Sequence, residues 1–455
     1  MNFKWMGVRR NPVPLAALVV IVGIPSMAMA SSERVDRTDA ARKAIVGGHA
    51  RNVILLIGDG MGDSEITIAR NYEVGAAGRL AMDKLPLTGA YTTYAVEKSD
   101  PTKPDYTPDS ASSATAFSTG HKSYDGAISV TPDERPQPTV LELAKRAGLR
   151  TGDVSTAELQ DATPAAAASH VPNRYCRGPQ SMTLCPASSK ENGGPGSISE
   201  QLIETKPDVL LGGGMRYFNQ TVQAGPYQGK TVLEQARASG YRIVTDGQAL
   251  AAATPDAPLL GLFADSDLDR EWTGPVPVRE NTPPAACAPN ADRAAGQPHL
   301  VDMTRKAIEL LSRQTEGKKR GFFLQIEGAA IDKAAHTADP CGQIGETVGF
   351  DAAVAEALRY QRRHPDTLVV VTADHGHSSQ IVEAGSVTSG LTATVRTREG
   401  ADMTVNYSTA PAPGWEQQHT GTQVRIAAGG PQAANVLGIT DQTEVFVNLR
   451  RALGI

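Results

Sequence analysis

Three short apolar runs, far apart along this chain, each lead directly into acidic residues. The runs RNVILLIGDG, GFFLQIEGAAID and TLVVVTADHGH deliver Asp59, Glu327 and Asp374, the last with His375 beside it. Short β-branched runs bounded by Gly, Pro or charge are typical of strands buried on both faces of a parallel sheet. Ligand sites in open α/β sheets form at the carboxyl ends of the strands, so we expect these acids to converge. Converging acids repel one another unless cations hold them, and the pattern therefore predicts a multi-metal enzyme.

Helix and strand patterns alternate along the rest of the chain. The segment PTVLELAKRAGLRTGDVSTAE has the pattern of a helix, a glycine stop and a strand, and DAAVAEALRYQRRHPDTLVVVTADHG repeats that order. This alternation predicts an α/β fold, with a large, mostly parallel central β-sheet and helices on both faces. We expect one domain over residues 51–455, with loop insertions near 173–197 and 265–298. A net charge of −5 without long charged runs argues against a nucleic-acid partner.

The first thirty residues have the composition of an export signal. Three basic residues precede the apolar run LAALVVIVGI, and a small-x-small site ends at Ala30. This order predicts a signal peptide over residues 1–30, cleaved near Ala30. The apolar run is too short to span a membrane comfortably, so we expect a periplasmic protein without stable membrane association after cleavage. The pair Arg9-Arg10 leaves the export route open, and the polar residues 31–50 predict an extended N-terminal arm.

The four cysteines of the chain favour disulfide bonds, because an even number in an exported protein is typical of paired thiols. The pairing nearest in sequence joins Cys176 to Cys185 and Cys287 to Cys341, one of three possible pairings. A thiolate metal site is disfavoured because the chain has no C-x-x-C spacing.

The segment PDSASSATA predicts the start of a helix built from small residues. Ser110 would lie near its N-terminus, where backbone amides and the helix dipole favour an anion. From spacing alone, a helix N-cap role for Asp109 or Ser110 is favoured over catalysis. No histidine lies nearby in the sequence to act as a base for the serine.

Several histidines and acids stand at spacings that suit zinc. Asp332 and His336 lie four residues apart, on one face if the segment is helical. His419, which alone would be taken for a surface residue, could supply a third protein ligand. His375 follows an acid at a strand end and is a candidate ligand, whereas we expect His377 to lie nearby without ligating, because a glycine separates the two.

A further oxygen-rich pair, Asp161 and Thr163, suits a hard hydrated cation such as magnesium. Thr163 before Pro164 is equally consistent with a helix cap. Arg174 could be any surface arginine, but a guanidinium is the natural bidentate partner of phosphate.

Taken together and in this order, six motifs resemble those of bacterial alkaline phosphatases of the exported, enterobacterial type. The motifs are IGDGMGDSE, PDSASSATAFSTG, STAELQDATPAA, IEGAAIDKAAH, VTADHGHSSQ and HTGTQVRIAA. The likeness runs from about residue 50 to the C-terminus. The resemblance implies a phosphomonoesterase of broad substrate range that acts on small phosphate monoesters at alkaline pH. It also implies a homodimer with two zinc ions and one magnesium ion per chain.

The resemblance assigns roles to individual residues. Ser110 would be the nucleophile that becomes a phosphoserine, and Arg174, Lys333 and Asp109 would serve the phosphate, Lys333 through water. The implied ligands are Asp332, His336 and His419 for one zinc, Asp59, Asp374 and His375 for the other, and Asp59, Thr163 and Glu327 for magnesium, with Asp161 reaching it through water. The cysteine pairing nearest in sequence also fits the family.

Departures from the family pattern lie in the periphery. Residues 173–197 depart most, and Tyr175 stands after Arg174 where the pattern often has a lysine. One alternative function is a phosphodiesterase or sulfatase on the same fold, against which Ser110, Arg174 and the full magnesium set argue. A second is a non-catalytic periplasmic protein that binds metal or phosphate, and Ser110, which no ligand set requires, argues against it.

Overall fold

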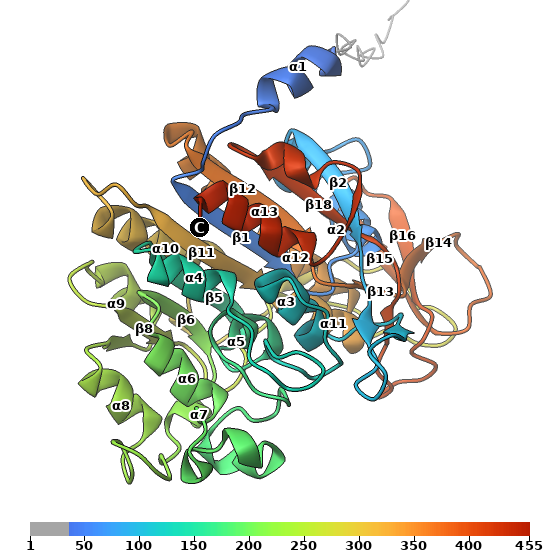
Figure 1. Cartoon of the computed structure of the whole chain (residues 1–455). Coiled ribbons are helices and arrows are strands. Elements are labelled where there is room, and N and C mark those ends of the chain that lie inside the picture. Colours follow the sequence, from blue (N-terminus) through green and yellow to red (C-terminus); the bar gives the residue numbers. More distant parts are fainter. Residues whose placement is uncertain (1–35) are drawn as a thin grey trace, which may run out of the picture.

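The computed structural model describes residues 36–455, so the predicted signal peptide lies outside the described residues. A ten-stranded sheet in the order β19-β2-β18-β12-β1-β11-β5-β6-β8-β7 forms the centre of the molecule (Figure 1). β18 runs antiparallel to both of its neighbours, and the other pairs are parallel. The strands are β1 (Asn52–Gly58), β2 (Leu87–Thr92), β5 (Arg150–Glu158), β6 (Val209–Gly213), β7 (Arg242–Val244), β8 (Leu259–Leu262), β11 (Phe322–Gly328), β12 (Thr367–Ala373), β18 (Val424–Gly429) and β19 (Ile439–Asp441).

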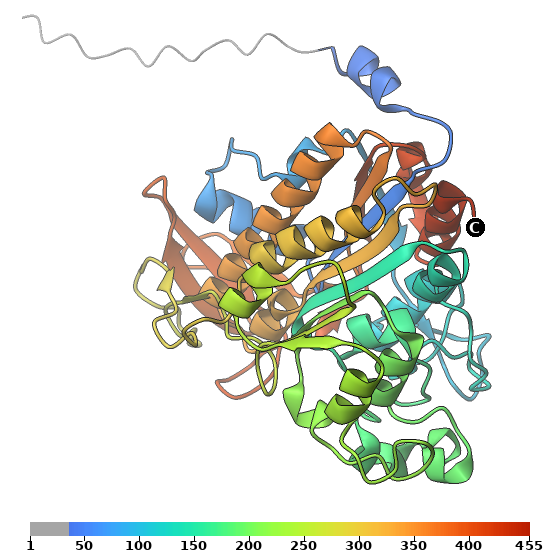
Figure 2. The same ribbon diagram turned by 90° about the vertical axis from the view of Figure 1, so that its left-hand side faces the viewer.

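Helices cover both faces of this sheet, which confirms the predicted α/β class. α10 and α12 pack together on one face, as Figure 2 shows, while α3, α4, α5 and α13 lie on the other. The helices of the body are α2 (Asp63–Glu73), α3 (Ser110–Thr119), α4 (Val140–Arg146), α5 (Ala162–Ala168), α6 (Ile198–Thr205), α7 (Met215–Phe218), α8 (Val232–Ala238), α9 (Gly247–Ala252), α10 (Leu300–Gln314), α11 (Ala330–His336), α12 (Pro340–Arg363) and α13 (Glu444–Leu453).

The three apolar runs form adjacent strands at the middle of the sheet. Every residue of β1, β11 and β12 is buried, as expected for strands covered on both faces. In the register of the sheet, Ile57 pairs with Glu327 on one side and Thr372 on the other. The strands therefore end level with one another, and the acids that follow or close them reach the same edge.

Smaller sheets flank this edge. β14 (Ser379–Val382), β16 (Asp402–Tyr407) and β15 (Leu391–Arg396) form a three-stranded antiparallel sheet. β13 (Gly376–His377) pairs with β17 (His419–Thr420), and this short ladder sets His377 opposite His419. The remaining two-stranded sheets are β3 (Ala95–Val96) with β4 (Pro104–Asp105), and β9 (Trp272–Thr273) with β10 (Ala288–Pro289).

The predicted insertions carry little regular structure, and both disulfides follow the pairing nearest in sequence. The first insertion contains three 3-10 helices and the Cys176–Cys185 bond, and the second contains β9, β10 and Cys287, which is bonded to Cys341. These helices are η2 (Pro179–Leu184), η3 (Pro186–Ser188) and η4 (Lys190–Asn192); η1 (Met82–Lys84) and η5 (Ala433–Val436) lie elsewhere. No helix among residues 36–455 is long and apolar enough to cross a membrane.

The prediction of an extended N-terminal arm is wrong for part of its length, because α1 (Arg37–Ala44) is helical. The Asp36 side chain caps the helix by accepting a hydrogen bond from the Thr38 amide at 2.9 Å, and Arg42 pairs with Asp39 one turn earlier. α1 stands away from the body of the molecule, and none of its side chains is buried (Figures 1 and 2).

Candidate active site

The predicted convergence of acids at the strand ends is confirmed. Asp59 leaves β1 and Asp374 leaves β12, and the Gly60 amide donates to Asp374 Oδ1 at 2.9 Å. Gly60 has a φ of +66°, and a Cβ at this position would meet the His377 ring at 2.7 Å, so the turn requires glycine. One ligand atom from each of Asp59, Asp374 and His375 lies within 4.8 Å of the other two. All three residues are buried.

A second group of ligand atoms lies beside the first. α11 supplies Asp332 and His336 from the predicted helical face, while β17 supplies His419. Asp332 Oδ1 lies 3.3 Å from Nε2 of His336 and 3.3 Å from Nε2 of His419. His336 Nδ1 faces the Gln417 carbonyl at 2.6 Å, and His419 Nδ1 faces the Pro108 carbonyl at 2.9 Å. A carbonyl can only accept, so each Nδ1 carries a proton, and Nε2 is the nitrogen of each ring that faces the group.

His377 lies closer to this group than its sequence context suggested. Its Nε2 is 2.5 Å from Asp332 Oδ1, so it belongs with Asp332, His336 and His419 among the candidate ligand atoms. Its immediate contact is nevertheless with the Asp332 carboxylate, which it orients. The intervening glycine hid this proximity, because the cross-strand pairing of His377 with His419 is a tertiary feature.

The charges of the clustered acids explain why cations suit this edge. Burial, followed by the nearby Asp374, raises the pKa of Asp59 well above its usual value. Burial raises the pKa of Asp374 to about 6 and that of Glu327 to about 8. Burial also opposes ionisation of Asp332, but its histidine neighbours hold the pKa of that carboxyl well below the ordinary value. The charged forms of Asp59, Asp374 and Glu327 are thus destabilised by burial and mutual repulsion, which bound cations would relieve.

Ser110 is the first residue of α3, as predicted, and its side chain is buried against the first group. Its Oγ lies 3.1 Å from His375 Nε2 and 3.4 Å from Asp59 Oδ1. The residue that caps the helix is Asp109, whose side chain accepts from the Ser112 amide at 2.9 Å. A histidine therefore does lie beside the serine, from a position 265 residues away along the chain.

His375 nevertheless lacks the arrangement of a general base. Its Nδ1 finds no hydrogen-bond partner among the described residues, so no acid orients the ring from behind, as one does in a catalytic triad. Instead, its Nε2 lies 3.5 Å from Asp59 and 3.3 Å from Asp374. Burial lowers the pKa of His375 well below its usual value, which leaves Nε2 able to ligate.

Glu327 in β11 and Thr163 in α5 come from neighbouring elements and form a third candidate group. The Thr163 hydroxyl oxygen is buried and has no hydrogen-bond partner among residues 36–455. Glu327 accepts a hydrogen bond from the Ser155 hydroxyl, a contact that the sequence did not signal. The helix cap considered for Thr163 is made by Asp161 instead, whose side chain accepts from the Ala162 amide at 3.0 Å.

Cations line the open side of the site. Arg174 bridges two acids, with Nη1 2.9 Å from Asp109 Oδ2 and Nη2 2.9 Å from Asp161 Oδ1. Lys333 lies 2.6 Å from Asp161 Oδ2 and 3.3 Å from Asp267. Burial opposes the charge of Arg174, but the two acids raise the pKa of its guanidinium, so the charge is retained.

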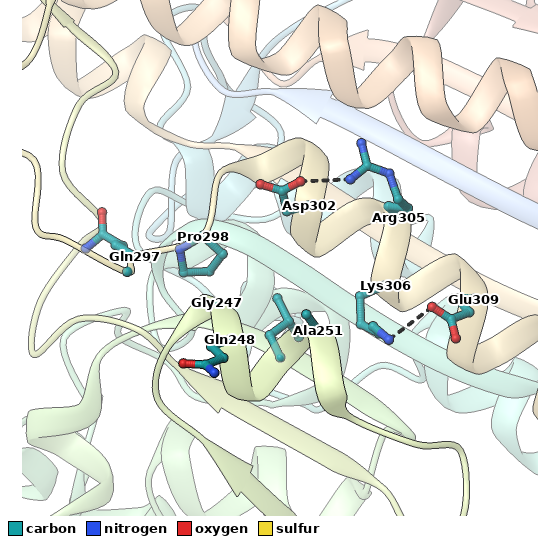
Figure 3. Close-up of a pocket in the computed structure, with 11 residues that line it drawn as sticks. Gly247, Gln248, Ala251, Gln297, Pro298, Asp302, Arg305, Lys306 and Glu309 are labelled. Atoms are coloured by element: carbon teal, nitrogen blue, oxygen red, sulfur yellow. Dashed lines mark hydrogen bonds and ion pairs between the residues drawn. The ribbon is translucent and has the colours of Figure 1, made fainter.

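A separate pocket between α9 and α10 has none of this chemistry (Figure 3). Its two cations are already paired on the same helix, Arg305 with Asp302 at 2.8 Å and Lys306 with Glu309 at 3.0 Å. None of the predicted site residues lines it. This pocket therefore offers no alternative to the cluster at the strand ends as the candidate active site.

Comparisons with known proteins agree with this geometry. The family model described as alkaline phosphatase matches residues 50–412 and 383–455. An alkaline phosphatase of Escherichia fergusonii is 53% identical over 428 residues, covering 92% of this chain and 89% of that protein. A streptomycin-6-phosphate phosphatase of Streptomyces griseus is 51% identical over 452 residues, covering 98% of both. The solved alkaline phosphatase of the Antarctic bacterium TAB5 shares the fold, with a TM-score of 0.66 at 24% identity, over 90% of this chain and 99% of that one.

Proposed function

We propose that this chain, which belongs to the alkaline phosphatase family, hydrolyses phosphate monoesters through a phosphoserine formed on Ser110. Phosphomonoester hydrolysis itself follows from the family. The observation that carries the role of Ser110 is its position. Ser110 is the first residue of α3, and its buried Oγ faces Asp59 and His375. Arg174 contacts Asp109, the residue directly before it.

The side chains suit an in-line displacement at phosphorus. The Ser110 oxygen forms the new P–O bond as the ester oxygen leaves with the bonding electron pair, and water then cleaves the serine ester to release inorganic phosphate. Arg174 exchanges its two carboxylate partners for two phosphoryl oxygens, which match its planar fork. Lys333, held by Asp161, adds positive charge beside the phosphoryl group, through water. Asp109 keeps the start of α3 in place by capping it.

We further propose that two zinc ions and one magnesium ion occupy the three groups. Asp332, His336 and His419 would hold one zinc, and the carbonyl-locked tautomers of the two histidines fit this role. The other zinc would lie among Asp59, Asp374 and His375, and the magnesium beside Asp59, Glu327 and Thr163, with Asp161 reaching it through water. When bound, these cations would lower the pKa of the serine hydroxyl and of water and offset charge on the phosphoryl oxygens.

The location and assembly of the protein are also proposals. The N-terminal sequence and the two disulfides support export to the periplasm. A homodimer is supported by the family resemblance and by α1, which has no buried side chain and leaves the body as a free arm. Size-exclusion chromatography with light scattering would test the dimer, and a monomer at micromolar concentration would count against it.

The test of the function is hydrolysis of p-nitrophenyl phosphate by the metal-loaded protein. Ser110→Ala should lower kcat/KM by about 10³-fold or more, because the covalent route is lost. The matched control is Ser113→Ala on the same helix, whose buried Oγ has no partner among the described residues and whose loss should leave activity unchanged. Full activity in Ser110→Ala would refute the nucleophile.

The choice of substrate separates the alternative functions. Bis-p-nitrophenyl phosphate and p-nitrophenyl sulfate should be poor substrates, and faster turnover of either would favour a diesterase or a sulfatase. Phosphate binding without turnover would favour a binding protein. A broad range also predicts hydrolysis of streptomycin 6-phosphate, for which the S. griseus relative is named.

A further inference from the structure

A second arginine enters the ion-pair cluster beside the proposed phosphate site. Arg177 Nη2 lies 3.1 Å from Asp161 Oδ1, the same oxygen that Arg174 Nη2 contacts at 2.9 Å. Its other nitrogen, Nη1, donates to the buried carboxylate of Glu158. Arg177 therefore shares one carboxylate oxygen with the guanidinium to which we assign the phosphate.

The backbone holds the two arginines in a fixed relation. The Arg174 amide donates to the Gly126 carbonyl at 2.8 Å, and the Arg177 carbonyl accepts from the Ser199 amide at 3.0 Å. Between them, Cys176 is anchored by its disulfide to Cys185. The Arg177 side chain is 16% exposed, and its guanidinium lies against the ring of Tyr217. These contacts fix the backbone on both sides of Cys176, so the two arginine side chains reach Asp161 from set positions.

Asp161 is thus one carboxylate among three cations, since Lys333 occupies its second oxygen at 2.6 Å. Burial opposes its charge, but Lys333, Arg174 and Arg177 hold the pKa of this carboxyl far below its usual range. Each of these cations also contacts a second acid: Arg174 contacts Asp109, Arg177 contacts Glu158 and Lys333 contacts Asp267. At Asp161 itself, however, three cations share one carboxylate, so this carboxylate holds Arg174 less strongly than it would in a one-to-one pair.

We propose that Arg177 is a positioning residue that strengthens phosphate binding by sharing Asp161 with Arg174. Without Arg177, the Asp161 oxygen would engage Arg174 alone and hold it more firmly away from an incoming phosphate. The inference rests on the proposed function, since it takes Arg174 as the phosphate-binding group.

A purely structural role for Arg177 is the competing explanation, because Glu158 is buried and needs cations. Arg216 offers the matched control: it pairs with the other oxygen of Glu158 and has no ion pair with Asp161 among the described residues. If neutralising Glu158 were what matters, Arg177→Met and Arg216→Met should act alike. If sharing Asp161 matters, the effect on phosphate should be confined to Arg177.

The experiment measures the inhibition constant of inorganic phosphate against p-nitrophenyl phosphate with the metal-loaded enzyme. Arg177→Met should raise this constant about tenfold, within the range of coupling between residues of one ion-pair network. KM should rise in parallel, while kcat stays level or rises, because phosphate held less tightly leaves faster. Arg177→Lys, which keeps the charge, should recover most of the affinity, and thermal melting should show both variants folded. Arg216→Met should change the constant less than about twofold.

A double-mutant cycle with Asp161→Asn decides whether Arg177 acts through Asp161. In that background, Arg177→Met should change phosphate binding by less than about twofold. An equal loss in both backgrounds, or wild-type affinity in Arg177→Met, would overturn the inference. Arg174→Ala separates this failure from that of the proposed function. If Arg174→Ala binds phosphate normally, the proposed site itself is wrong, whereas weak binding there with normal binding in Arg177→Met overturns the inference alone.

Discussion

We expect the two disulfides to rank in opposite order for their effects on stability and on phosphate binding. Cys287 and Cys341 are 54 residues apart in sequence, whereas Cys176 and Cys185 are nine apart. In the loop-entropy description, a crosslink stabilises the fold by constraining the unfolded chain, and its effect grows with the logarithm of the loop length. At 25 °C this gives about 4.2 kcal/mol for the long loop and about 2.6 kcal/mol for the short one.

The positions of the two bonds predict the reverse ranking for their effects on phosphate binding. Cys176 lies between Arg174 and Arg177, so its bond to Cys185 fixes the segment that carries both guanidiniums. The other bond ties the second insertion to the first turn of α12 and touches none of the proposed phosphate-binding residues. Loss of the short crosslink should therefore weaken phosphate binding, and loss of the long one should not.

Paired Cys→Ala variants of each bond test both statements. Urea unfolding of the metal-loaded proteins, followed by circular dichroism, should show the larger stability loss for the Cys287 and Cys341 pair, by about 1.6 kcal/mol. Phosphate inhibition should weaken for the Cys176 and Cys185 pair, with the other pair close to wild type. An equal or greater stability loss on opening the short loop would refute the entropic reasoning. Unchanged phosphate inhibition in that variant would refute the positional reasoning.

Three further predictions address the metals and a buried acid. Thr163→Val removes a hydroxyl that has no partner among the described residues, so the free energy of unfolding of the metal-free protein should stay unchanged or rise. The same substitution should weaken activation by magnesium about tenfold or more. An unaltered magnesium titration would count against the site. Chelation should abolish p-nitrophenyl phosphate hydrolysis, zinc plus magnesium should restore it, and elemental analysis should return two zinc ions and one magnesium ion per chain. Burial raises the pKa of Glu346 to about 8, so between about pH 4.5 and pH 8 the folded state retains a proton that the unfolded state has lost. Across this range the residue makes the free energy of unfolding fall as pH rises, and above about pH 8 its contribution stays constant. Glu346→Gln keeps an acceptor for the Glu271 amide and should match wild type near pH 5 but exceed it on the order of 2–4 kcal/mol at pH 9, measured by urea unfolding; equal pH profiles would contradict this assignment.

The central strands and the local spacings were predictable because short-range patterns determine them. β1, β11 and β12 read as apolar runs since each is covered on both faces, and Asp332 and His336 share a helical face through simple periodicity. The register that brings the three strands to the same edge depends on packing across the sheet and could not be predicted from local patterns. The acids that follow or close the apolar runs nevertheless indicated at which edge the ligands meet. The resemblance to a known family then supplied the roles of individual residues.

The contacts that escaped prediction join distant segments by side chains without a local pattern. His375 reaches Ser110 across 265 residues, and Arg177 reaches Asp161 from an irregular insertion. No periodicity places an arginine of a loop on a given carboxylate. The helical α1 was missed for a different reason: polar composition was taken as extended, although Asp36 and the following alanines and arginines favour a capped helix.

Burial of an acid is not by itself a signal of function in this protein. Burial raises the pKa of Glu65 and of Glu346 to about 8, as it does for Glu327. One oxygen of Glu65 accepts a hydrogen bond from the Ser379 hydroxyl, and Glu346 accepts one from a backbone amide. Two further acids, Asp161 and Asp374, also raise the pKa of Glu327, whereas Glu346 has one such neighbour, Glu271. The distinguishing feature is thus several buried acids whose charges oppose one another at one edge, an arrangement that is stable when cations bind and costly without them.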